Sequence, residues 1–146
     1  MLDLLGEAGC VSIEAGVESI TVEGRNLLDK GSRLSTGELT ERLTYAKRRV
    51  PFVQANLLES GNDDPEAVDK WRDHLHRHGV WANKPVPMFP YPVSPGYTRR
   101  WGAADDHAWE RALASYLEAY RDFSDIQDAR PLPLSELEGD TRDAFR

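Results

Sequence analysis

The stretch VSIEAGV, residues 11–17, alternates apolar and polar side chains and is rich in β-branched residues. This pattern predicts a β-strand with one apolar and one polar face. Ser12, Glu14 and Gly16 share the polar face with Glu18, which follows the stretch directly. An acidic face on an otherwise apolar strand is the feature from which the fold and the function of the chain are predicted.

Two more strands are expected downstream. Residues 52–58 form the second strand and place Gln54 and Asn56 on its polar side, and a third strand begins at Val80. Helices are predicted between the strands: a last turn at residues 2–5, a short helix at 21–30, a helix opened by the capping box of Ser35 and Glu38, and one capped by Asp64 and closed by Gly79.

The apolar faces of these helices follow the helical period. They are Leu39, Leu43 and Ala46 in one helix, Val68, Trp71 and Leu75 in the next, and Trp109, Leu113, Tyr116 and Tyr120 in a final helix over residues 106–123. Trp71 and Trp109 are expected to be packed residues. Residues 124–146 are polar and are expected to form an irregular tail.

Strands that alternate with helices imply parallel pairing and right-handed crossovers. The predicted fold class is therefore α/β: the C-terminal half of a partial (β/α) barrel, with about three parallel strands and flanking helices. Residues 1–104 would be the barrel part, and residues 105–146 the last helix and the tail. Three strands leave both sheet edges open. We therefore expect a missing N-terminal half, or another chain, to cover the sheet edge.

The polar face of the strands carries the functional prediction. A parallel sheet that is covered on both faces reads as almost continuously apolar, whereas here two successive strands carry polar side chains on one face. Such a face would line a wet cavity; the alternative is a solvent-exposed antiparallel edge. Active sites in βα barrels collect where the strands end, and Glu18, Ser19 and Asn56 occupy those positions.

Gly16-Val17-Glu18-Ser19, followed by Lys30, resembles the fourth strand and next helix of radical SAM (S-adenosylmethionine) enzymes. The resemblance implies that Glu18 and Ser19 lie at the S-adenosylmethionine site and that Lys30 reaches the carboxylate of this cofactor. It also places Asn56 at the cofactor, after the fifth strand of the family's barrel.

Residues 87–95, PMFPYPVSP, resemble the end of the sixth strand, where cobalamin-binding members of the superfamily carry Pro-Tyr-Pro-Gly-Ser/Thr-Pro. Val93 stands where glycine is usual. Residues 105–111 and 123–127 are also similar to a cobalamin-dependent subgroup, so the resemblance covers roughly residues 1–127. It implies that Tyr91 lies on the substrate side, and that a parent enzyme uses a small-molecule substrate and cobalamin. On the polar face of the strands, Gln54 is also placed on the substrate side, and Glu14, deeper in the cavity, is either a substrate-facing or a structural polar group.

The chain departs from the family at the cluster motif. The Cys-x-x-x-Cys-x-x-Cys loop that binds the 4Fe-4S cluster is absent, and Cys10 is the single cysteine. Three thiolates are needed to hold such a cluster. The chain is therefore expected to be a fragment that supplies part of the S-adenosylmethionine and substrate site and is inactive alone. The alternative is a non-catalytic interaction domain that pairs through its open sheet edge.

Composition and charge restrict the remaining possibilities. The formal net charge of −7 argues against a nucleic-acid or anionic-membrane surface. No apolar run approaches the roughly 20 residues of a membrane span, the N-terminus does not resemble a leader, and one cysteine allows no internal disulfide, so we expect a cytoplasmic protein. His74 and His78, at i,i+4 spacing, either chelate zinc or belong, with His76, to a solvated helix end. No metal ligand is assigned.

Overall fold

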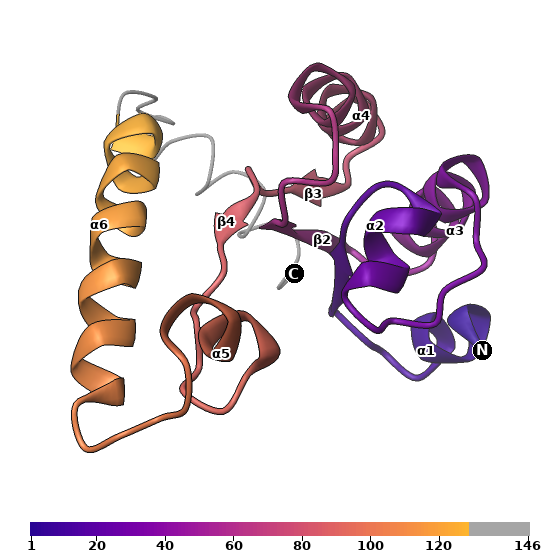
Figure 1. Ribbon diagram of the computed structural model, residues 1–146. Coiled ribbons are helices and arrows are strands. Elements are labelled where there is room, and N and C mark those ends of the chain that lie inside the picture. Colours follow the sequence, from indigo (N-terminus) through magenta and orange to yellow (C-terminus); the bar gives the residue numbers. More distant parts are fainter. Residues whose placement is uncertain (129–146) are drawn as a thin grey trace. The chain divides into compact units, whose positions relative to one another are not determined.

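The computed structural model describes residues 1–128, with side chains described up to Arg121 (Figure 1). The chain divides into two compact units, residues 1–85 and residues 86–128. Each unit is described by itself. The expected irregular tail falls mostly outside the described residues, except that residues 124–128 belong to the last helix rather than to a tail.

The first unit is an α/β structure with a parallel sheet, as the sequence predicts. Its strands pair in the order β1-β2-β3, and both pairs of strands are parallel. The elements are α1 (Leu2–Glu7), β1 (Ser12–Glu18), α2 (Val22–Leu27), α3 (Thr36–Lys47), β2 (Phe52–Glu59), α4 (Pro65–Arg77) and β3 (Trp81–Ala82).

The apolar side of the sheet forms the core of this unit. Val53, Ala55 and Leu57 of β2 are fully buried, and the expected apolar faces of α3 and α4 pack in the same cluster. The α4 face is confirmed in full, because Val68, Trp71 and Leu75 are all buried. The α3 face is confirmed at Leu43 and Ala46, and Leu39 is partly buried against the cluster.

Local capping explains where the helices begin. Ser35 caps α3 with both hydrogen bonds of the predicted capping box: its hydroxyl accepts from the Glu38 N–H, and the Glu38 carboxylate accepts from the Ser35 N–H. Asp64 caps α4 by accepting from the Ala67 N–H at 2.9 Å. Both predicted helix starts are therefore confirmed.

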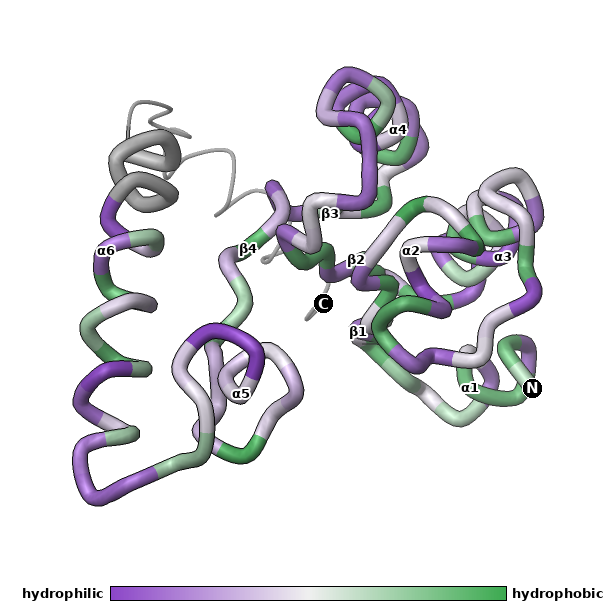
Figure 2. Tube along the Cα trace, viewed as in Figure 1, coloured by the Kyte–Doolittle hydropathy of each residue, from purple (hydrophilic) through white to green (hydrophobic). Residues whose placement is uncertain are grey.

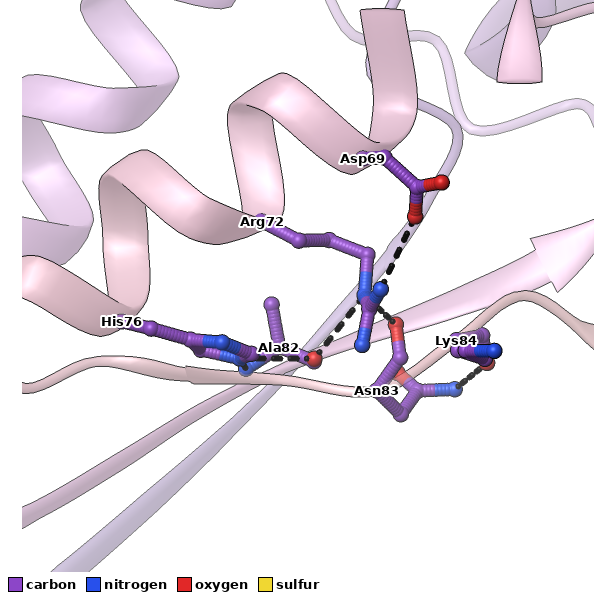
Figure 3. A network of polar contacts seen from close by, with 6 residues as sticks. All are labelled: Asp69, Arg72, His76, Ala82, Asn83 and Lys84. Carbon is purple, nitrogen blue, oxygen red and sulfur yellow. Dashed lines mark hydrogen bonds and ion pairs between the residues drawn. The ribbon is translucent and has the colours of Figure 1, made fainter. Parts of the chain in front are cut away.

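Strand β3 is only two residues long. Side chains form hydrogen bonds with backbone groups that a longer strand would pair. Asn83 Oδ1 accepts from the Leu57 N–H at 2.8 Å, and Asn83 Nδ2 donates to the Leu57 carbonyl at 3.1 Å. From α4, Arg72 Nε donates to the carbonyls of Ala82 and Asn83, and His76 Nε2 lies 3.0 Å from the Ala82 carbonyl oxygen and 3.1 Å from the Ala82 nitrogen (Figure 3). These contacts provide partners for backbone groups of Leu57, Ala82 and Asn83 after the short strand ends.

The second unit contains β4 (Val86–Pro87), α5 (Pro95–Trp101) and α6 (Ala108–Asp128). Its small core is Tyr97, Ala108 and Ala112, with Phe89 and Trp101 packed against it. Arg111 donates to the Tyr97 hydroxyl at 2.9 Å and pairs with Asp105 at 2.7 Å. The last helix, expected over residues 106–123, begins two residues later than expected and ends five residues later.

The expected apolar face of α6 is present but is not a buried face. Hydrophobic and hydrophilic stretches alternate along the helix (Figure 2), and Trp109 is 61% exposed, so the prediction that it is a packed residue is wrong. Helical spacing cannot distinguish a core face from an exposed aromatic one. None of the helices formed by residues 1–128 combines the length and hydrophobicity needed to cross a bilayer.

Candidate functional site

The chain turns sharply where β1 ends, and this turn presents the principal candidate residues. Glu18 has a positive φ of 66°, and the pairing with β2 shifts register between Gly16 and Glu18, as at a β-bulge. Positive φ is uncommon outside glycine and marks a constrained backbone. Bulges of this kind re-aim side chains at the ends of strands.

Glu18 forms an ion pair with Lys30, the basic residue that the sequence singles out. Lys30 Nζ lies 2.9 Å from Glu18 Oε1, and the side chains are 42% and 15% exposed respectively. Lys30 follows α2, where Asp29 and Gly31 both have positive φ values. The structure thus brings a carboxylate and an ammonium group together at the carboxyl end of β1, with both still reachable from solvent.

Gly16 leaves the space in which this ion pair lies. A Cβ atom at Gly16 would be 2.7 Å from Glu18 Oε1 and 3.5 Å from Lys30 Nζ. The first distance is shorter than real Cβ contacts, so any larger residue would displace the carboxylate. A glycine here marks a close approach rather than a flexible turn.

Ser19 lies next to Glu18, but its side chain is engaged in the interior. It is fully buried, and its hydroxyl donates to Asp63 Oδ1 at 2.7 Å. The same carboxylate accepts from the Ile20 N–H at 3.1 Å and from the Thr21 hydroxyl at 2.9 Å. Asp63, in the turn after β2, therefore holds the turn after β1 in place through three hydrogen bonds.

Arg25 of α2 reinforces this turn from beneath. Its side chain donates to the carbonyls of Ser19, at 2.9 Å, and Leu34, and the residue is only 3% exposed. No described residue accepts from Arg25 Nε. Thr36 adds a further bond, donating to the Ile20 carbonyl at 2.7 Å. None of the ion pairs among the described residues joins a carboxylate to Arg25. Its guanidinium group therefore stabilises the turn through hydrogen bonds to carbonyls and not through an ion pair.

The polar face of the sheet continues away from this turn. Glu14 is the register partner of Gln54, and Gly16 is that of Asn56, so these predicted site residues lie side by side. Gln54 Nε2 donates to Asn56 Oδ1 at 2.5 Å. Glu14 is exposed, whereas Gln54 and Asn56 are half-buried. The structure thus brings a carboxylate and two amides together on the open face of the sheet.

Tyr91 is the one predicted site residue outside the first unit. It is 56% exposed, its ring centroid lies 4.9 Å from that of Phe89, and it meets Trp109 edge-on at 6.2 Å. Tyr91 therefore belongs to an aromatic group of the second unit.

Three residues of the turn were not predicted as part of the site: Asp63, Thr21 and Arg25. The partners of Asp63 lie more than 40 positions away in the sequence, whereas those of Arg25, Ser19 and Leu34, lie within nine positions but are not marked by any motif. Thr21 had a local signal, because it caps α2 by accepting from the Gly24 N–H at 3.1 Å.

The donor set can be compared with the cofactors that the resemblance implies. Cys10, the only cysteine of the chain, donates its thiol to the Ser12 carbonyl at 3.3 Å, ahead of β1. One thiol does not fit a four-iron cluster, which needs three. Among the side chains that the structure describes, up to Arg121, no group of three or more could hold a metal ion. By contrast, Glu18 and Lys30 fit a ligand that carries both an ammonium and a carboxylate group.

No protein-family model matches the chain, and neither the curated proteins nor the solved structures compared with it include a match.

Proposed function

We propose that this chain supplies part of an S-adenosylmethionine site, as the C-terminal half of a partial (β/α) barrel of the radical SAM type. The observation that carries the proposal is the ion pair between Glu18 and Lys30 at the carboxyl end of a parallel strand. Ligand sites of α/β barrels gather at this end of the strands.

The pair is complementary to the amino-acid portion of the cofactor. Lys30 donates to the carboxylate, and Glu18 accepts from the ammonium group, so each partner of the ion pair exchanges one charged contact for another. Charge-assisted hydrogen bonds of this kind are among the stronger ones in proteins. Asp63 and Ser19 act behind the pair by fixing the turn that carries Glu18.

The polar face of the sheet supports the partial-barrel proposal. Helices cover the apolar side, where Val53 and Ala55 are fully buried, while Glu14, Gln54 and Asn56 occupy the other side. Parallel sheets that are covered on both faces carry mostly apolar side chains on both, so carboxylates and amides on one face favour an uncovered face. We assign Glu14 and Gln54 to the substrate side of the site and Asn56 to the cofactor side.

Radical SAM chemistry additionally requires a reduced iron–sulfur cluster, which this donor set does not fit. We therefore propose that the cluster cysteines come from another segment or chain that pairs with the sheet, and that the 146 residues alone carry out no cleavage of S-adenosylmethionine. The chain contributes binding and positioning only.

Equilibrium dialysis with labelled S-adenosylmethionine tests the proposal on the chain itself. We expect weak, saturable binding that falls at least fivefold in Lys30→Met, because a methionine side chain cannot donate to the carboxylate. Lys70→Met is the matched control: Lys70 forms an exposed i,i+4 ion pair with Glu66, so its removal should leave binding unchanged. Absence of saturable binding, or equal loss in both variants, would contradict the assignment.

A second candidate function is an interaction domain that pairs through the edge of β1. The outer edge of β3 is covered by Arg72 and His76 from α4. On β1 the Val11 carbonyl accepts from the Phe52 N–H, so by alternation the backbone groups of Glu14 and Gly16 point away from β2. No hydrogen bond to those groups is found within residues 1–128, and an unpaired edge invites another strand. This candidate predicts no cofactor binding in the dialysis experiment.

A further inference from the structure

We propose that His74 and His78, at the carboxyl end of α4, form a two-histidine site for a divalent transition-metal ion. The site is separate from the turn after β1 and does not depend on the function proposed there. It uses the only pair of histidines that residues 1–128 place in ring-to-ring contact.

The helix positions the two rings for chelation. His74 is in the last turn of α4 and His78 is its C-cap residue, so the two are four residues apart on one side of the helix. Their ring centroids are 4.5 Å apart, with the ring planes inclined by 34°. Zinc–nitrogen bonds are about 2.0–2.1 Å long, so one ion can bridge two rings at this separation.

A hydrogen bond fixes which nitrogen of His78 is free. His78 Nδ1 lies 2.8 Å from the His74 carbonyl oxygen, which can only accept, so Nδ1 carries the proton. In the neutral ring the lone pair is then on Nε2. Metal-binding histidines commonly donate their other N–H to a backbone carbonyl in this way, which fixes the tautomer and orients the ring. His78 is already held in a binding-competent tautomer.

The surroundings of the pair permit entry of an ion. His78 is exposed and His74 half-buried, and neither ring is in an ion pair among the described residues. The carbonyl end of a helix also favours cations. His76, by contrast, is engaged at the edge of β3, where its Nε2 lies within hydrogen-bond distance of the Ala82 backbone and its ring stacks on Trp81 at 5.1 Å.

The donors define the class of metal. Imidazole nitrogen suits Cu²⁺, Ni²⁺ and Zn²⁺, whereas Mg²⁺ prefers oxygen. The described residues add no third ligand, so water completes the coordination shell and the ion exchanges readily. Affinity should follow the general order for nitrogen sites, with Cu²⁺ bound more tightly than Ni²⁺ or Zn²⁺.

Isothermal titration of the tag-free chain with Cu²⁺, Ni²⁺, Zn²⁺ and Mg²⁺ tests the site. We expect one equivalent of Cu²⁺ to bind most tightly, no heat from Mg²⁺, and a loss of Cu²⁺ affinity of at least tenfold in both His74→Ala and His78→Ala. His107→Ala is the matched control, because His107 is an exposed histidine that pairs with Glu110. Circular dichroism of each variant verifies that the fold is kept.

Equal losses in His74→Ala and His78→Ala, with His107→Ala unchanged, support chelation by the pair. A loss in only one of the two variants would overturn the proposal, since it would indicate a single-histidine contact. An equal loss in His107→Ala, or Mg²⁺ binding with the affinity of Cu²⁺, would also overturn it.

Discussion

Two glycines in similar helical positions have opposite surroundings. Gly24 and Gly37 each lie in the first turn of a helix, after the caps Thr21 and Ser35. A Cβ atom at Gly24 would be 2.0 Å from Ser19 Oγ, inside the buried cluster, whereas at Gly37 the nearest atom is 4.0 Å away. Gly24 is therefore needed for the turn that carries Glu18, and Gly37 is not needed for packing.

This difference makes a prediction for stability. Gly24→Ala should lower the free energy of unfolding by about 1–3 kcal/mol, because the added methyl group overlaps the Ser19 side chain. Gly37→Ala should raise it by about 0.5–1 kcal/mol, since alanine favours the helix. Urea unfolding monitored by circular dichroism measures both. Stabilisation by Gly24→Ala would show that Ser19 is not held where the structure places it.

The sequence reveals the residues of the site only in part. Glu18, Lys30 and Asn56 could be predicted because strand ends and a spaced motif mark them. Asp63 could not, because its role depends on hydrogen bonds to residues more than 40 positions away. Nor does sequence indicate that the Ser19 hydroxyl points into the interior, since a serine after a strand is equally compatible with a ligand contact.

At the scale of elements, α1 is held by a polar contact with α3. Tyr45 of α3 donates its hydroxyl to Asp3 Oδ1 at 2.6 Å, and Arg49 pairs with the same oxygen at 2.6 Å. A helix of six residues is marginal alone, so these contacts and the packing of Leu2 against the core retain it. The Tyr45 hydroxyl, and secondarily Arg49, lower the pKa of Asp3.

The lowered pKa predicts a pH dependence. A carboxyl whose pKa is lower in the folded state stabilises the fold above its unfolded pKa of about 3.9, and this contribution is lost as pH falls through the folded value. In Tyr45→Phe the pKa of Asp3 should rise. At pH 7 the free energy of unfolding of Tyr45→Phe should be lower than that of the unmodified chain. This difference should shrink below about pH 4.

Carboxyl-carbon NMR titration measures this effect, with Glu38 as the internal control. Hydrogen bonds from Ser35 lower the pKa of Glu38, and Tyr45 takes no part in them. The pKa of Glu38 should therefore stay the same in Tyr45→Phe. An unchanged pKa of Asp3 in the variant would show that the hydroxyl does not bond this carboxylate.

Elements with strong local signals were predictable. Alternation identified β1 and β2, and caps identified the starts of α3 and α4. The shortness of β3 was not predictable, because it depends on Asn83 replacing a ladder partner of Leu57. The exposure of Trp109 was likewise not predictable, since the helical period gives a face but not what covers it.

At the scale of the whole molecule, the parallel α/β arrangement followed from the order of the elements. The sheet has helices on its apolar side, a polar face with Glu14 and Gln54, and one edge covered by α4 side chains. The boundary between the two compact units lies after Pro85, and no low-complexity linker in the sequence marks it. Within the described part of the chain, the polar face of the sheet and the edge of β1 are not covered by α4 side chains in this way. In our proposal, the segment that completes the site binds there.

The most direct test of the proposed site is a nitrogen-15 NMR titration of the chain with S-adenosylhomocysteine, a stable analogue that keeps the amino-acid portion. We predict saturable shift changes concentrated at Gly16, Glu18 and Lys30, extending to Asn56, and abolished in Lys30→Met. Saturable changes centred elsewhere in the chain, or none at millimolar ligand, would contradict the proposal that the Glu18–Lys30 pair binds this cofactor.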